Sequence, residues 1–229
     1  MKLTPAGLAG MIDHTLLKPE ATIEQIVVLC REAVAYGFKA VCLNPCYVPF
    51  ACRELDGAQV VVCPVIGFPL GASASRNKAF EVAQAVNTGA KEVDMVMNIG
   101  FLKSGMLKET GEDMRAVVTA AKKENPAAIV KVILETCLLT NEEIKTACCL
   151  AQEAGCDFVK TSTGFSISGA RIEDIKLMRK TVGPDMGIKA AGGIKTLEDA
   201  VSMLQAGATR LGMSAGVSIM KQLTIYDEN

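Results

Sequence analysis

The sequence predicts an α/β protein, a single-domain (β/α)8 TIM barrel spanning residues 1–229. Short runs rich in β-branched residues alternate with longer amphipathic segments, and no linker or change in composition divides the chain. The short runs are almost continuously apolar, as is typical of parallel strands buried on both faces. An open doubly wound sheet would carry G-x-G-x-x-G after its first strand, and "DHTLLKPEAT" lacks it. Eight units therefore favour a closed barrel.

Strands and helix ends can be assigned from residue types. The amphipathic segments begin at threonines suited to N-capping and end at glycines suited to C-capping. The predicted strands are 11–17, 40–45, 60–68, 92–100, 129–135, 157–163, 187–193 and 209–214, and the caps pair as Thr22 with Gly37, Thr140 with Gly155, and Thr196 with Gly207.

Composition excludes several classes of protein. The chain is 50% hydrophobic and 21% charged, so it can bury a large core, and its net charge of −1 gives no support for a nucleic-acid or membrane partner. An N-terminal signal peptide is not expected, because Pro5 and Asp13 interrupt the apolar residues. No segment approaches the roughly 18 apolar residues of a membrane span.

The cysteines do not form a metal-binding motif. Nine cysteines are scattered through apolar runs without a CxxC pair, and His14 is the one histidine. We therefore expect no metal and no other cofactor. An odd number of thiols in buried segments fits a reducing compartment, so a cytoplasmic location is predicted.

Three lysines occupy the interiors of consecutive predicted strands. Lys131, Lys160 and Lys189 are separated by equal intervals of 29 residues, on strands five, six and seven. A lone lysine would most often extend from a strand end to water. Three on neighbouring strands, about 4.8 Å apart, indicate a shared interior site. Burial and mutual repulsion are expected to lower their pKa values, as a nucleophilic amine that forms a Schiff base with a carbonyl requires.

Two carboxylates accompany the lysines. Asp94 lies on strand four, next to the lysine-bearing strands, and Asp13 lies on strand one. An acid in an apolar strand needs a partner. A structural hydrogen bond explains Asp13 as well as a functional role does. For Asp94 the neighbouring lysines predict an ionised group in the site.

The ends of the last strands suggest an anion site. Barrel enzymes often bind phosphate at the loops after strands seven and eight. Glycines let backbone amides approach an anion, and a helix N-terminus favours a dianion. The candidates are Thr163, Gly164, Gly192, Gly193, Lys195, Gly212, Ser214 and Gly216.

These segments resemble the class I deoxyribose-phosphate aldolases, which join acetaldehyde to glyceraldehyde 3-phosphate. The stretches "IDHTLLKPEAT", "VCLNPCYV", "VIGFPLGA", "EVDMVMNIG", "VKVILETCLL", "FVKTSTGF", "IKAAGGIKTLEDA" and "GATRLGMSAGV" follow in family order from residue 11 to about 217. The resemblance implies a barrel lyase that needs no metal or other cofactor. Its implied partners are phosphorylated sugar and aldehyde substrates, and we expect a homo-oligomer, a dimer or tetramer.

The resemblance also implies roles for individual residues. Lys160 would form the Schiff base, Lys189 would keep that amine unprotonated, and Asp94 would move protons through a bound water. The residues implied around substrate hydroxyls and the water relay are Asp13, Thr15, Cys42 and Lys131, and those implied to hold phosphate are Gly164, Gly192, Gly193, Gly212 and Ser214, with Thr163 close by.

The chain departs from the family pattern at the phosphate end. Ala215 stands where relatives often carry a second serine, Met213 replaces a smaller residue, and "GFSISGAR" replaces a more glycine-rich run. Some relatives end in a tyrosine that enters the site, and Tyr226 is near the end here. The alternatives are another Schiff-base aldolase or transaldolase, and a non-catalytic phosphosugar-binding barrel.

Overall fold

The chain folds into a closed parallel barrel of eight strands, as predicted. The computed structural model describes residues 4–227, with side chains described through Leu223, so the side chain of Tyr226 lies outside the described part. The strands pair in sequence order and the eighth closes on the first. They are β1 (Ile12–Leu16), β2 (Ala40–Leu43), β3 (Val61–Ile66), β4 (Glu92–Val96), β5 (Ile129–Ile133), β6 (Phe158–Lys160), β7 (Gly187–Ala191) and β8 (Arg210–Met213).

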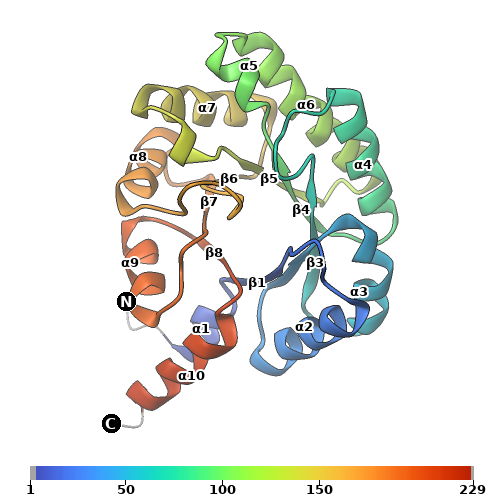
Figure 1. Ribbon diagram of the computed structural model, residues 1–229, viewed down its shortest axis with the longest axis vertical. Coiled ribbons are helices and arrows are strands. Elements are labelled where there is room, and N and C mark those ends of the chain that lie inside the picture. The colour runs from blue at the N-terminus through green and yellow to red at the C-terminus, as the bar shows by residue number, and fades with distance from the viewer. Residues whose placement is uncertain (1–3, 228–229) are drawn as a thin grey trace.

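Helices surround this ring of strands (Figure 1). Short 3₁₀ turns at Pro45–Tyr47 and Thr136–Leu138 follow β2 and β5. The helices are α1 (Pro5–Ala9), α2 (Ile23–Tyr36), α3 (Val48–Glu54), α4 (Ser75–Asn87), α5 (Ile99–Lys103), α6 (Leu107–Glu124), α7 (Asn141–Ala154), α8 (Ile172–Val182), α9 (Leu197–Ala206) and α10 (Gly216–Asp227).

The predicted helix caps are confirmed. At the starts of α2, α7 and α9 the threonine hydroxyl accepts a hydrogen bond from the amide three residues later, and that residue's side chain accepts from the threonine amide. All three helices end at a glycine in the left-handed conformation, which an L-residue with a Cβ adopts only at a cost. Local sequence therefore sets where these helices begin and end.

All eight strands are shorter than predicted, and two of them lose four residues each. The segment 157–163 forms strand only over Phe158–Lys160, although the Thr161 amide still donates to the Lys189 carbonyl at 3.1 Å. The segment 92–100 ends as strand at Val96, because α5 begins at Ile99 with Asn98 as its N-cap. Both differences place polar residues in loops at the carboxyl end of the barrel.

Alternation along the strands separates two environments. Outward residues such as Val41, Met95 and Ile188 pack with the helices in a large apolar core. Inward positions carry the charged residues of the strands, and Asp13, Asp94 and other ionisable groups are fully buried there. The hydrophobic core of this protein thus lies between the strands and the helices, and the barrel interior is polar.

A buried ion pair ties the outer layer to the barrel. Lys78 of α4 donates to Asp113 of α6 at 2.7 Å and to the Val96 carbonyl at the end of β4 at 2.9 Å. Neither charged side chain is exposed. Burial lowers the pKa of Lys78, and the Asp113 carboxylate opposes that effect. Three elements therefore depend on a single ammonium group.

We predict that Asp113→Asn destabilises the fold strongly, because it leaves the Lys78 ammonium buried without its counter-ion. The expected loss is about 3–5 kcal/mol in the free energy of unfolding, measured by urea denaturation. The matched control is Glu112→Gln on the same helix, which removes an exposed pair with Lys108 and should change stability by less than about 0.5 kcal/mol. Equal losses for the two variants would contradict the prediction.

Candidate active site

Three lysines converge on one carboxylate inside the barrel. Lys160 and Lys189 both donate to Oδ2 of Asp94, at 2.6 and 2.7 Å. Lys131 donates to the other oxygen, Oδ1, at 3.0 Å. All four side chains are buried. The equal sequence spacing of the lysines therefore does place them together, and Asp94 is the group that joins them.

A second layer of charges extends the cluster downward. Lys189 also donates to Asp13, whose other oxygen accepts from Arg210 at 2.8 Å. Arg210 in turn donates to Glu92 at 2.9 Å, and Glu92 lies 2.7 Å from the Lys131 ammonium. Asp13 is thus a member of the cluster. Four cations and three carboxylates form one connected network.

The strand register sets the height of each lysine. Lys160 pairs with Lys189 across β6 and β7, so these two lie in the same layer. Lys131 pairs with Phe158, two residues before Lys160, and therefore lies one layer lower. Lys160 is the last residue of its strand. By contrast, β7 continues for two residues beyond Lys189, to Ala191.

The carboxylates reverse the effect that lysine clustering alone would have. Burial would lower the pKa of Lys189, but the Asp13 and Asp94 carboxylates overcome it and raise that pKa. Burial would likewise lower the pKa of Lys131, but Asp94 and the other neighbouring acids overcome this effect and raise it. The expectation of lowered pKa values is wrong for these two lysines, which are held as cations. The lysines in turn keep the pKa of Asp94 well below its usual range, against the effect of burial.

A cavity of about 340 Å³ lies at the carboxyl ends of β1, β6, β7 and β8. Lys160 is the member of the cluster that lines it, whereas Lys131, Lys189 and Asp94 lie beneath. Asp13 and Cys42, expected near substrate hydroxyls, are also beneath it. The predicted residues that the cavity brings together are Thr15, Lys160, Thr163, Gly164, Gly192, Gly193, Lys195, Gly212 and Ser214.

Two positions at this cavity require glycine, each for a different physical reason. Gly192 has φ of 82° and would place a Cβ 2.9 Å from the backbone of Gly169, so both conformation and space require glycine. Gly212 has an ordinary φ, but a Cβ there would lie 2.9 Å from Cε of Lys189. Its missing side chain makes room for the lysine, a role that the loop pattern did not suggest.

Sequence reasoning missed Glu92, Glu135 and Arg210. Glu92 and Arg210 lie two residues before Asp94 and Gly212, so strand alternation could have placed them in the interior. Glu135 follows β5 with φ of 57°, rare for a residue with a side chain. Its buried carboxylate accepts from the amide of Thr163 at 3.2 Å and from the Thr163 hydroxyl. It therefore fixes the loop after β6.

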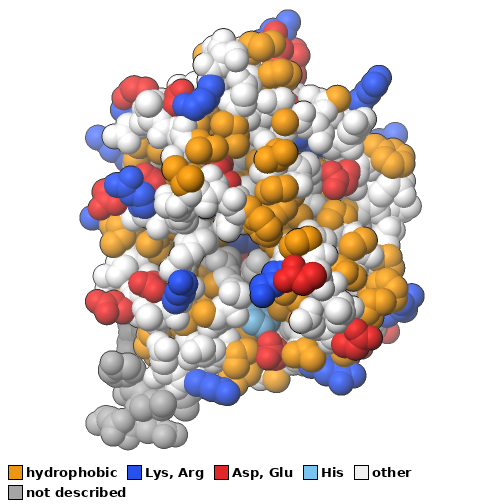
Figure 2. Space-filling view, viewed as in Figure 1, with side chains coloured by type: hydrophobic (Ala, Val, Ile, Leu, Met, Phe, Trp, Pro, Cys, Tyr) orange, Lys and Arg blue, Asp and Glu red, His pale blue; other side chains and the backbone are white. Residues whose placement is uncertain are grey.

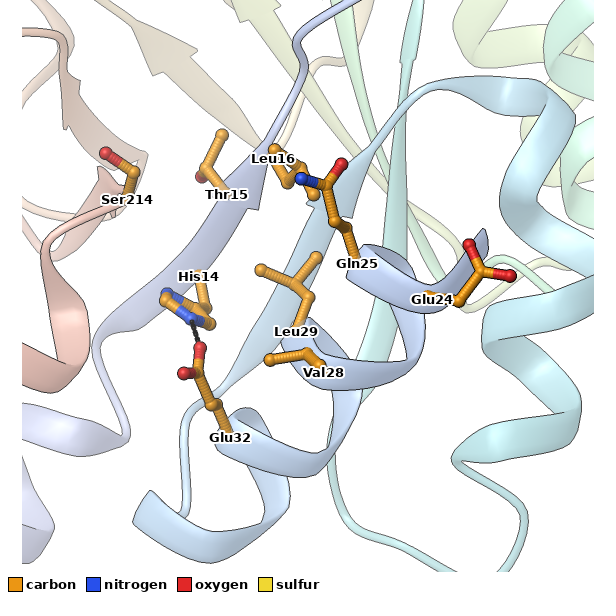
Figure 3. A pocket seen from close by; sticks show the side chains of 9 residues that line it. All are labelled: His14, Thr15, Leu16, Glu24, Gln25, Val28, Leu29, Glu32 and Ser214. Atoms are coloured by element: carbon orange, nitrogen blue, oxygen red, sulfur yellow. Dashed lines mark hydrogen bonds and ion pairs between the residues drawn. The ribbon is translucent and has the colours of Figure 1, made fainter. Parts of the chain in front are cut away.

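A second hollow, of about 360 Å³, lies outside the barrel between β1 and α2 (Figure 3). Its histidine, His14, makes a 2.7 Å contact with Glu32 and packs against the ring of Phe38. Thr15 and Ser214 border both this hollow and the cavity above Lys160. The outer hollow carries none of the buried lysines. The cavity above Lys160 is therefore the candidate active site.

Two thiols adjoin the cluster. Cys42 and Cys63 pair across β2 and β3, and Cys63 lies 3.2 Å from Asp94. Within the described residues, Cys42, Cys63 and Asp94 are close enough together to hold a metal ion. Every oxygen of Asp94 is already engaged by a lysine, so a cation there would have to displace ammonium groups. The donor set does not fit a resident metal.

The rim of the cavity is apolar on one side. Phe165 packs edge-on against Phe68 with ring centres 5.2 Å apart, and the side chains of Phe165, Ile167 and Leu70 are more than half exposed. Figure 2 shows hydrophobic side chains gathered near the middle of this face. Of these three residues, Phe165 lines the cavity, so an exposed aromatic side chain stands at its edge.

A buried lysine–carboxylate cluster beneath a cavity at the carboxyl end of a (β/α)8 barrel defines an enzyme-like site of the aldolase type. The family model described as "DeoC/LacD family aldolase" matches residues 8–222. The chain belongs to that family and is an enzyme of the aldehyde-lyase class.

Relatives agree over nearly the whole chain. Deoxyribose-phosphate aldolases of Carboxydothermus hydrogenoformans and Streptococcus sanguinis are 57% and 60% identical, covering 94% and 92% of this chain and 95% and 94% of their own lengths. The structure described as the unique tetrameric structure of deoxyribose phosphate aldolase from Aeropyrum pernix matches with a TM-score of 0.90 at 35% identity, covering 96% of this chain and 92% of that one. Among the described residues, no helix has the length and apolar character needed to cross a membrane.

We predict an acid-dependent loss of stability from Asp13. Burial would raise the pKa of its carboxyl, but Lys189, Lys131 and Arg210 lower it from 3.8 to about 2. A carboxyl with a depressed folded-state pKa stabilises the fold above its unfolded pKa, and that contribution is lost as pH falls through the folded value. The expected loss is on the order of 2 kcal/mol in the free energy of unfolding between about pH 4 and pH 2.

The measurement is urea denaturation across that range, with Asp13→Asn as the comparison. The variant should be less stable at neutral pH, because Lys189 and Arg210 lose their counter-ion, and its stability should depend less on pH over this interval. An unchanged pH dependence in the variant would show that other carboxyls dominate acid unfolding.

Proposed function

We propose that this aldolase reversibly cleaves 2-deoxy-D-ribose 5-phosphate to D-glyceraldehyde 3-phosphate and acetaldehyde through a Schiff base on Lys160. The amine attacks the C1 aldehyde and water leaves, which gives an iminium. The C2–C3 bond then breaks as the C3 hydroxyl loses its proton, and its electron pair forms an enamine. Protonation at C2 and hydrolysis release acetaldehyde and restore the amine.

The observation that carries the proposal is the position of Lys160. It is the lysine of the cluster that both contacts Asp94 and lines the cavity. It has one carboxylate partner, whereas Lys189 has two and Lys131 has three. Because the network holds four cations and three carboxylates, loss of one proton would balance its charge. Lys160 is the least paired and most accessible amine of the cluster, and it is therefore the one proposed to act as the nucleophile.

Asp94 and Lys189 are proposed to manage protons and charge around that amine. Asp94 is held ionised by its lysine partners and lies 2.6 Å from Nζ of Lys160. It can accept protons through a water in the cavity. Lys189, held as a cation next to the same carboxylate oxygen, disfavours a second positive charge on Lys160.

The glycine-rich loops are proposed to bind the phosphate, and the inner residues to support the sugar. Gly164, Gly192 and Gly193 all have φ between 80° and 85° at the cavity, and Ser214 precedes the N-terminus of α10. Exposed amides and a helix N-terminus suit a dianion. The residues proposed around the hydroxyls and the water relay are Asp13, Thr15, Cys42 and Lys131, and Gly212 and Thr163 are proposed to adjoin the phosphate.

Two alternatives are separable by substrate. Another Schiff-base aldolase or a transaldolase would turn over a different sugar phosphate faster, and a phosphosugar-binding barrel would turn over none. The names of the relatives favour deoxyribose 5-phosphate. A mere binder would also have no need for an accessible amine beside a second lysine.

We further propose that residues 1–229 form one domain and that the protein is a cytoplasmic homo-oligomer, a dimer or tetramer. The free thiols of all nine cysteines support a reducing compartment. The relative described as tetrameric supports self-association.

We predict that acetaldehyde followed by borohydride labels Lys160. Peptide mass spectrometry should locate the reduced adduct there, because the iminium forms only on an accessible amine. Lys160→Met should abolish the label and reduce cleavage of deoxyribose 5-phosphate by on the order of 10³-fold or more. Lys108→Met, which changes an exposed lysine, is the control and should retain both. An adduct confined to surface lysines would sink the mechanism.

We predict that Ser214→Ala weakens binding of the phosphorylated substrate alone. Loss of one hydrogen bond to a charged group should raise KM for deoxyribose 5-phosphate by about tenfold. The KM for unphosphorylated deoxyribose should not change, since the missing hydroxyl would face only the phosphate. Ser202→Ala in α9, which lies outside the cavity lining, is the control. A KM change shared by both sugars would place Ser214 elsewhere in the site.

A further inference from the structure

The lower end of the barrel carries a large hollow close to the charge cluster. Its volume is about 670 Å³, and its lining comes from the amino ends of β5, β6 and β7 and the residues that precede them. Phe158 lines this hollow, whereas Arg210 does not. The Arg210 side chain is 7% exposed. Something therefore separates the cluster from water at this end.

Phe158 occupies the intervening space. It lies two residues before Lys160, so its side chain faces the same interior. Its ring lies under the Arg210 guanidinium, with the guanidinium carbon 5.4 Å from the ring centre. A cation over an aromatic face is attracted to it, more strongly where water is excluded.

Gly187 provides room for that ring. It is the direct partner of Phe158 across β6 and β7. A Cβ at this position would lie 2.2 Å from Cε1 of Phe158, and the backbone of Gly187 does not have a positive φ. The glycine is thus explained by space for the ring and not by conformation.

Contacts lead from Phe158 to the proposed nucleophile. Arg210 donates to Asp13 at 2.8 Å, and Asp13 accepts from Lys189. Lys189 and Lys160 share one oxygen of Asp94. A displacement of Arg210 would therefore reach Asp94 through buried, charged contacts that have no water to replace them.

Resting on the function proposed above, we propose that Phe158 is a positioning residue for the aldolase reaction. It closes the floor of the barrel, keeps water from the charge cluster, and holds Arg210 against Asp13. Through Arg210 it keeps Lys189 and Asp94 aligned with Lys160, although it lies on the opposite side of the cluster from the cavity. Phe158 can perform this role without any ligand in the hollow below it.

The test compares Phe158→Ala and Phe158→Leu with the conservative Phe158→Tyr. One readout is independent of activity: ¹⁵N NMR of the buried lysine ammonium groups, which give signals when shielded from exchange with water. We expect these protons to exchange at least about tenfold faster in Phe158→Ala and to stay protected in Phe158→Tyr. The second readout is cleavage of deoxyribose 5-phosphate, with kcat reduced about tenfold or more, KM within about twofold, and a shifted pH profile.

Met186→Ala is the matched control, because it removes a buried side chain from the same hollow without removing the ring under Arg210. It should leave ammonium exchange and kcat near the wild-type values. If Phe158→Ala does not fold, the proposal is tested with Phe158→Leu. Leucine keeps an apolar side chain at this position but has no aromatic ring to lie under the Arg210 guanidinium. Exchange and kcat in the folded Phe158 variant equal to those of Met186→Ala would overturn the proposal. Failure of the wild type to cleave deoxyribose 5-phosphate would refute the proposed function. The exchange measurement would still test whether Phe158 keeps water from the charge cluster.

Discussion

The site depends on one carboxylate shared by three lysines. Asp94 binds Lys131, Lys160 and Lys189 in a space without bulk water, where an unpaired ammonium would be too costly to bury. Asp13 and Glu92 supply the further negative charges that offset the buried ammonium groups of Lys189 and Lys131. A barrel interior is usually filled by layers of branched apolar side chains. Here much of that filling is ionic, so hydrophobic stabilisation comes mainly from the layer between strands and helices.

The strands and the loops have different tasks in the site, which explains why the strands carry the charged residues and the loops carry glycines. Strands hold a side chain to a fixed direction and height, which a cluster with contacts below 3 Å requires. Loops after β6 and β7 approach one another closely enough that Gly169 and Gly192 tolerate no side chain. Rigid elements therefore position the charges, and the loops shape the space above Lys160.

Much of the fold and part of the site could be predicted from sequence. Buried parallel strands, threonine caps and equally spaced lysines leave local signals, so the order of β5–β7 and the starts of α2, α7 and α9 were assigned correctly, whereas β6 ends three residues earlier than predicted. The pKa direction of Lys189 was wrong, because the expectation weighed burial and the repulsion between lysines without the Asp13 and Asp94 carboxylates. Glu135 leaves no local signal, since its left-handed backbone is imposed by tertiary contacts with the loop that carries Thr163.

The charge balance connects the resting site to the chemistry. With every group ionised, four cations face three carboxylates, and the mechanism proposed above uses Lys160 as a neutral amine, which would remove the excess. In that proposal, formation of the iminium would place a positive charge back on that nitrogen, next to Asp94. The cluster would then hold the same charges as its fully protonated form, so the carboxylates that keep the lysines in place would also stabilise the proposed cationic intermediate. Preorganisation of this kind requires Asp94 to stay ionised, which its lysine partners ensure.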